Sequence, residues 1–126
     1  VYIDQSGSIG DDDIAAFTGV LTGLAKSATF TFYNFDTRVD ENSKQTWRKG
    51  KKNIEIQRTV CGGTCFQSVE NHFKENSDVY DGYIVLTDGC ASKPTPCIKR
   101  RCWVLLPSYR LMFTHDTTDV VVNMEK

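Results

Sequence analysis

Three short clusters of hydroxyl and carboxyl side chains are the residues of this chain whose types and spacing best suit chemistry. They are Asp4-Gln5-Ser6-Gly7-Ser8, the threonine of Gly62-Gly63-Thr64, and Thr87-Asp88-Gly89. Asp4, Ser6 and Ser8 alternate, so a turn at Gly7 can point all three side chains inward. Their oxygen atoms are hard ligands of the kind that Mg²⁺, Mn²⁺ and Ca²⁺ prefer. The pattern predicts a divalent metal site with these ligands: Asp4, Ser6, Ser8, Thr64 and Asp88.

Each of these residues also has an ordinary structural interpretation. Ser6 could cap a turn, Thr64 could cap the start of a helix, and Asp88 could close a turn through its own side chain. Five such coincidences at one edge of a sheet are less expected than a shared role. We therefore favour the metal site over five separate capping roles.

The elements that would position these residues are strands alternating with helices. The apolar runs Val1–Asp4 and Tyr83–Leu86 are typical of buried parallel strands that end in loops. Acidic residues at 11–13 precede apolar residues at helical spacing, and Phe66–Phe73 has a similar apolar face, so two helices are expected. Further strands are expected at Ala28–Phe35, Thr37–Trp47 (at a sheet edge), Cys102–Leu106 and Val120–Val122, with a short strand at Ile54–Gln57 and a non-helical segment at Tyr109–Asp119.

This alternation predicts an α/β fold with a parallel sheet. In such sheets, ligands bind outside the carboxyl ends of the strands, near the point where the strand order reverses. The three polar clusters fall at those ends, so the fold and the metal hypothesis support each other.

The complete pattern resembles the metal-ion-dependent adhesion site of von Willebrand factor A (VWA) domains. It consists of Asp-x-Ser-x-Ser, a later threonine after glycines, and Thr-Asp-Gly after an apolar strand. Asn34–Val39 is similar to the segment that ends the family's second strand. A closer likeness is to VWA-like domains of bacteria and phages that follow a metallopeptidase-like domain. Gly62-Gly63-Thr64 before a helix, and prolines with Trp103 after Thr87-Asp88-Gly89, resemble that subgroup.

The resemblance implies a Rossmann-like, three-layer fold: a mostly parallel central sheet with an antiparallel edge strand and helices on both faces. It also implies that Ser6 and Ser8 bind the ion directly, that Thr64 binds directly or through water, and that Asp4 and Asp88 add charge. The ion then has an open position for an Asp or Glu of a partner protein, for which a MoxR-type AAA+ ATPase is one candidate. The expected rim of the partner site comprises Gln5, Gly63 and Gly89.

Composition limits the classes of function. With 126 residues, of which 40% are hydrophobic, residues 1–126 are expected to form one domain. Its formal net charge of -1 argues against nucleic acid as a partner. No apolar run is long enough to span a membrane, so we expect a soluble domain. The odd number of cysteines and the lack of a leader favour a cytoplasmic protein. The chain starts inside a strand, so we expect it to be a domain of a longer protein, and the resemblance implies that this domain belongs to the C-terminal part of that protein.

The basic run at residues 48–52 is interpreted as a solvated loop rather than a phosphate site. The odd count of cysteines favours reduced thiols, and their spacing is near that of structural zinc ligands but does not match it. The five cysteines are Cys61, Cys65, Cys90, Cys97 and Cys102.

Hydrolase alternatives remain beside the binding module. A cysteine nucleophile could pair with His72 or His115. A metallohydrolase would need carboxylate or histidine ligands and a general base, whereas this predicted ligand set is rich in hydroxyls. An accessory role in a metallopeptidase-like protein is a further alternative. We expect no catalytic residue in this domain alone.

Overall fold

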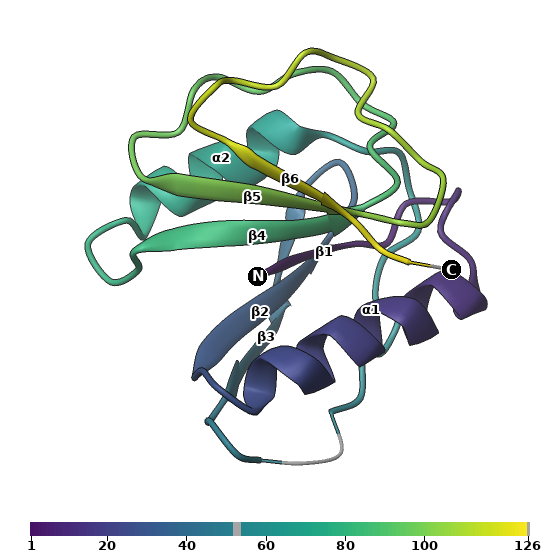
Figure 1. The fold of residues 1–126 in the computed structure, drawn as a ribbon, viewed down its shortest axis with the longest axis vertical. Coiled ribbons are helices and arrows are strands. Elements are labelled where there is room, and N and C mark those ends of the chain that lie inside the picture. Colours follow the sequence, from purple (N-terminus) through teal and green to yellow (C-terminus); the bar gives the residue numbers. More distant parts are fainter. Residues whose placement is uncertain (52–53, 126) are drawn as a thin grey trace.

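The structure is a computed structural model that describes residues 1–51 and 54–125. The two helices each lie between strands, as the sequence predicts, but the last three strands follow one another without a helix in the described residues (Figure 1). The elements are β1 (Tyr2–Asp4), α1 (Asp11–Ala25), β2 (Phe30–Phe35), β3 (Val39–Trp47), α2 (Phe66–Glu75), β4 (Gly82–Thr87), β5 (Arg100–Leu105) and β6 (Val120–Asn123).

The strands form one six-stranded mixed sheet in the order β3-β2-β1-β4-β5-β6. All neighbouring pairs are parallel except β2 and β3, so the edge strand β3 is antiparallel, as expected. From β1 the chain continues to β2 on one side, and β4 later pairs with β1 on the other side. The strand order therefore reverses between β1 and β4, which is where α/β sheets bind ligands.

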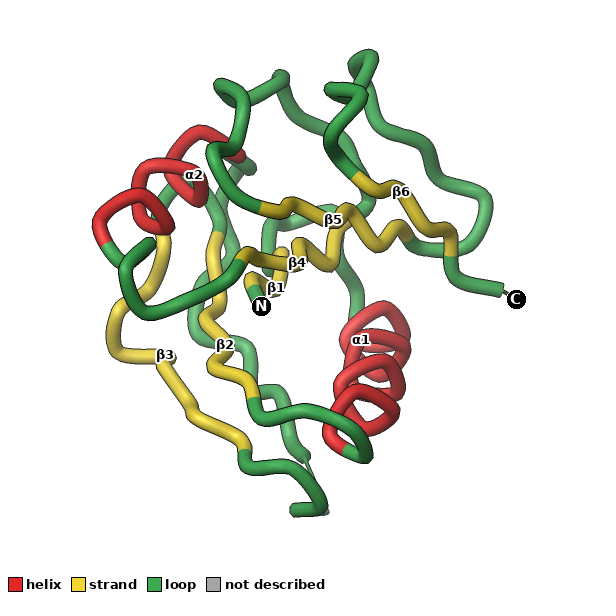
Figure 2. The backbone as a smooth tube through the Cα atoms, turned by 60° about the vertical axis from the view of Figure 1, so that its left-hand side comes forward, coloured by secondary structure: helices red, strands yellow, loops and turns green. Residues whose placement is uncertain are grey.

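The two helices cover opposite faces of the sheet (Figure 2). Phe17 and Leu21 of α1 pack with Ile3 in one hydrophobic cluster. Phe66 of α2 packs with Trp103 in the other cluster, where their ring centroids are 4.8 Å apart. Side chains alternate between the two faces of a strand, so Ile3 faces α1 while its neighbour Tyr2 lies in the α2 cluster.

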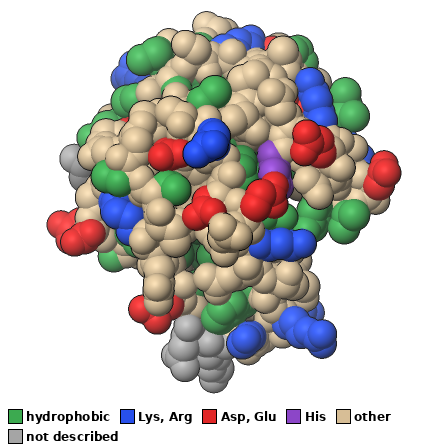
Figure 3. Space-filling view, turned by 180° about the vertical axis from the view of Figure 1, so that it is seen from behind, with side chains coloured by type: hydrophobic (Ala, Val, Ile, Leu, Met, Phe, Trp, Pro, Cys, Tyr) green, Lys and Arg blue, Asp and Glu red, His purple; other side chains and the backbone are tan. Residues whose placement is uncertain are grey.

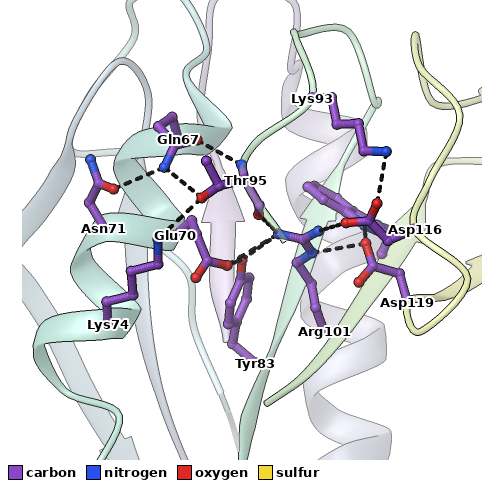
Figure 4. A network of polar contacts seen from close by, with 11 residues as sticks. Gln67, Glu70, Asn71, Lys74, Tyr83, Lys93, Thr95, Arg101, Asp116 and Asp119 are labelled. Atoms are coloured by element: carbon purple, nitrogen blue, oxygen red, sulfur yellow. Dashed lines mark hydrogen bonds and ion pairs between the residues drawn. The ribbon is translucent and has the colours of Figure 1, made fainter. Parts of the chain in front are cut away.

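A buried arginine ties α2 to β5 and to the loop before β6 (Figure 4). Arg101 is 1% exposed. Its guanidinium lies 3.1 Å from Glu70 Oε1, 2.9 Å from Asp119 Oδ2 and 3.2 Å from Asp116 Oδ2. Tyr83 also donates a hydrogen bond of 2.6 Å to Glu70. The buried charges are therefore paired, which is the condition under which charges are tolerated in a protein interior.

Two sequence expectations about the segments between elements have different outcomes. The expected strand at Ile54–Gln57 does not form. Instead, Ile54 and Ile56 are buried in the cluster on the α1 side, so their alternation reflects packing of a loop rather than strand pairing. Tyr109–Asp119 contains no helix, as expected.

The face of the molecule drawn in Figure 3 carries charges of both signs, in line with the 15 basic and 16 acidic residues of the sequence. The basic run is exposed at residues 48–51, and Lys52 lies outside the described residues. No helix in the described part of the chain is long and apolar enough to cross a membrane.

Candidate metal site

The loop between β1 and α1 folds back on the carboxylate that ends β1. The backbone N–H of Ser6 donates to Asp4 Oδ1 at 2.9 Å, and the N–H of Ile9 donates to the Ser6 carbonyl at 2.9 Å. This turn brings the hydroxyl oxygens of Ser6 and Ser8 within 3.3 Å of each other. The alternating residues Asp4, Ser6 and Ser8 therefore lie together, as their spacing predicts.

The end of β4 completes this cluster from the neighbouring strand. The Ser8 hydroxyl donates to Asp88 Oδ2 at 2.7 Å. The Thr87 hydroxyl donates to Asp4 Oδ2 at 2.6 Å and accepts from the N–H of Gly89 at 3.1 Å. Two hydrogen bonds thus cross the switch point, so four of the predicted ligands are connected: Asp4, Ser6, Ser8 and Asp88.

The third loop lies against the first through its backbone. The N–H of Gly7 donates to the Gly62 carbonyl at 2.9 Å. Gly62 in turn donates to Asp36 Oδ2 at 3.0 Å, and a Cβ atom at Gly62 would lie only 2.8 Å from that oxygen. Thr64 follows two residues later and is half-buried. No hydrogen bond within the described residues joins its hydroxyl to the other four ligands, so its place at the site rests on the loop contact.

Comparisons with family models, with curated proteins and with solved structures found no match. What the site can do is therefore inferred from its own geometry and from its sequence pattern.

Burial places the negative charge of the site in an unfavourable environment. Asp4 is fully buried and Asp88 is 2% exposed. Burial raises the pKa of the Asp4 carboxyl and the charge of Asp88 raises it further, while hydrogen bonds from Thr87 and Ser6 oppose the shift. A cation between the two carboxylates would compensate this charge.

The donor set fits a hard divalent cation. Its members are carboxylate and hydroxyl oxygens from three loops, and no soft ligand is required. Among the described residues, no group of three or more His, Cys, Asp or Glu side chains is arranged to hold a metal ion. That finding gives no support to a zinc site at the cysteines. The candidate site instead has two carboxylates and three hydroxyls.

The structure places the three expected rim residues differently. Gly63 is exposed, whereas Gly89 is buried. Gln5 is fully buried, and both ends of its side-chain amide are hydrogen-bonded to residues 57–59. Gln5 and Gly89 therefore support the loops from inside, and of the three only Gly63 is exposed to a partner.

Two supporting residues are missing from the predicted ligand set. Thr87 links the two strands through its hydroxyl, and Asp36 holds the Gly62 loop. Both follow apolar strand residues at the same sheet edge as the ligands, so their positions in the sequence could have indicated a role at the site. Thr87 also belongs to the Thr-Asp-Gly motif, whose aspartate alone was predicted to be a ligand.

The cysteines and histidines do not form a nucleophile pair in the described residues. All five cysteines are free. His72 contacts Tyr2 through Nδ1 at 2.7 Å and Glu41 through Nε2 at 2.7 Å. His115 bonds the Asp116 carbonyl. Because neither ring is hydrogen-bonded to a thiol, the geometry does not favour a cysteine hydrolase.

Proposed function

We propose that this chain is a VWA-like, three-layer domain that binds a divalent cation and uses it to capture a carboxylate of a partner protein. The ligands would be Asp4, Ser6, Ser8, Thr64 and Asp88, and the ion Mg²⁺, Mn²⁺ or Ca²⁺. The observation that carries the proposal is the connected set of oxygen atoms at the switch point of the sheet. In particular, the 2.7 Å contact between Ser8 and Asp88 joins the two halves of the sequence pattern.

The chemistry of the donors favours binding over hydrolysis. Hydroxyl oxygens are weaker donors than carboxylates, so an ion held largely by Ser6, Ser8 and Thr64 would retain affinity for a further anion. An Asp or Glu side chain of a partner would supply that anion. In the described residues, His72 is hydrogen-bonded to Tyr2 and His115 to the Asp116 carbonyl, and neither histidine is hydrogen-bonded to a candidate ligand.

The partner class follows from this chemistry and from the resemblance. We propose a protein that presents an acidic side chain, and a MoxR-type AAA+ ATPase is the candidate suggested by the VWA-like subgroup. The resemblance also suggests an accessory role beside a metallopeptidase-like domain, which would supply any catalysis.

Displacement of water from a bound Mn²⁺ ion tests carboxylate capture directly. We would load the domain with Mn²⁺ and follow the relaxation rate of water protons while adding acetyl-glutamate-amide. A carboxylate that takes the open position displaces metal-bound water and lowers the relaxation rate. Acetyl-glutamine-amide is the matched control, because it has the same shape without the charge.

We expect the acidic peptide, and not its amide counterpart, to lower the relaxation rate at millimolar concentration. Equal responses to both compounds would contradict carboxylate capture even if the domain binds Mn²⁺.

A further inference from the structure

Residues 57–59, here called the clasp segment, hold the loop that carries the first three proposed ligands. The two ends of the Gln5 side-chain amide bond the clasp backbone: Nε2 donates to the Gln57 carbonyl and Oε1 accepts from the N–H of Thr59, both at 2.9 Å. Asn34 of β2 fixes the same segment by donating to the Gln57 carbonyl at 2.9 Å and to the Thr59 hydroxyl at 3.0 Å. The clasp segment is thereby anchored to the ends of β1 and β2.

Arg58 lies at the centre of the clasp segment, and its guanidinium contacts both ends of the loop at residues 5–9. One guanidinium nitrogen, Nη1, donates to the Gln5 carbonyl at 2.9 Å, and the other, Nη2, donates to the Ile9 carbonyl. These carbonyls lie on either side of Ser6 and Ser8 in the sequence. The guanidinium of Arg58 therefore bridges the two ends of the loop that carries Ser6 and Ser8.

We propose that Arg58 is a positioning residue for the metal site, which fixes the Ser6 and Ser8 hydroxyls through its two hydrogen bonds to the carbonyls that flank them. We call this pair of hydrogen bonds the staple. This inference rests on the proposed function. Gly7 and Ser8 are exposed, and a glycine restricts the backbone less than any other residue, so the order of this loop depends on its hydrogen bonds. The staple orders this loop before the ion binds, so less ordering of the loop is left to metal binding. Residues outside the ligand set commonly have this role at metal sites.

The bridging geometry requires arginine rather than any cation. A guanidinium presents several N–H donors in a fixed plane and can reach two carbonyls at once, whereas a lysine ammonium is a compact point charge. Arg58→Lys would keep the charge and much of the stem but lose the bridge. This variant separates the staple from a general electrostatic effect.

The test is a titration with Mn²⁺ in which electron paramagnetic resonance measures the free ion. We expect Arg58→Ala to raise the dissociation constant by about 10- to 100-fold and Arg58→Lys to raise it as well. Arg48→Ala is the matched control, because Arg48 is an exposed arginine on the basic loop, and it should bind as the wild type does. Circular dichroism in EDTA would check folding, and Arg58→Lys carries the test if Arg58→Ala does not fold.

A second measurement separates positioning from stability. Luminescence lifetimes of bound Eu³⁺ in H₂O and D₂O count the water molecules on the ion, and we expect more of them in both Arg58 variants. Unchanged Mn²⁺ affinity and water count in these variants would overturn the staple while leaving the proposed function intact. A wild-type domain that binds no Mn²⁺ would instead overturn the proposed function, and the staple with it.

Discussion

The hydroxyl and carboxylate oxygen atoms of Asp4, Ser6, Ser8 and Asp88 lie close together at the switch point of the sheet. The residues that carry them were predictable because ligand chemistry restricts the residue types, and alternate spacing restricts their positions. The roles of Gln5 and Arg58 were not predictable. Their contacts join residues 49 to 54 positions apart, and each of these contacts involves a backbone group, which leaves no pattern in a sequence.

Gly89 gives a test of backbone conformation at the site. Its φ of 81° is in the left-handed region, and an added Cβ would lie 2.6 Å from the Arg110 carbonyl oxygen. Gly89→Ala should lower the free energy of unfolding by about 1–2 kcal/mol for the conformation alone, and by more for the contact.

Gly19→Ala is the matched control for this substitution. Gly19 lies in α1 with no atom within 4 Å of an added Cβ, so alanine there should raise the free energy of unfolding by about 0.5–1 kcal/mol. Urea denaturation measures both variants. A Gly89→Ala protein as stable as the wild type would show that the conformation at Gly89 is not required.

The elements follow closely from hydrophobic periodicity. Both helices, β4 and the edge strand β3 lie where their patterns place them. Ile54–Gln57 differs because alternation records which side chains are buried and not whether the backbone pairs. The two buried isoleucines satisfy the pattern by packing against the α1 side of the core.

Arg101 tests how the elements on the α2 side are held together. Arg101→Met would leave the carboxylates of Glu70 and Asp119 buried without their partner, and their side chains are 0% and 2% exposed. Breaking such a buried pair should lower the free energy of unfolding by about 3–5 kcal/mol. Lys93→Met is the comparison, because Lys93 pairs with Asp116 from a side chain that is 40% exposed, and exposed pairs contribute little.

Urea denaturation of these two variants distinguishes a structural network from a surface one. If both variants lowered the free energy of unfolding by the same small amount, the carboxylates around Arg101 would become hydrated without a cost in free energy. That result would contradict the account of α2 and β5 as elements joined by a buried ion network.

For the molecule as a whole, the α/β class and the edge at which ligands bind follow from the alternation of elements and from general rules of sheet topology. The strand order itself needed the structure, because the sequence does not state on which side of β1 the strand β4 pairs. That pairing is what places Asp88 beside Ser8. The central claim concerns this whole arrangement: one divalent ion held by loops from three parts of the chain.

Thermal unfolding with and without the ion tests this claim most directly. The domain would be melted in EDTA, Mg²⁺, Mn²⁺ and Ca²⁺, as the wild type and as Asp88→Ala, with Asp78→Ala as a control at an exposed aspartate. An ion at ten times its dissociation constant should stabilise the fold by about 1.4 kcal/mol, which raises the melting temperature by several degrees. We predict this shift for the wild type and Asp78→Ala and its loss in Asp88→Ala. An equal shift in all three proteins, or no shift in the wild type, would contradict a metal ion at this site.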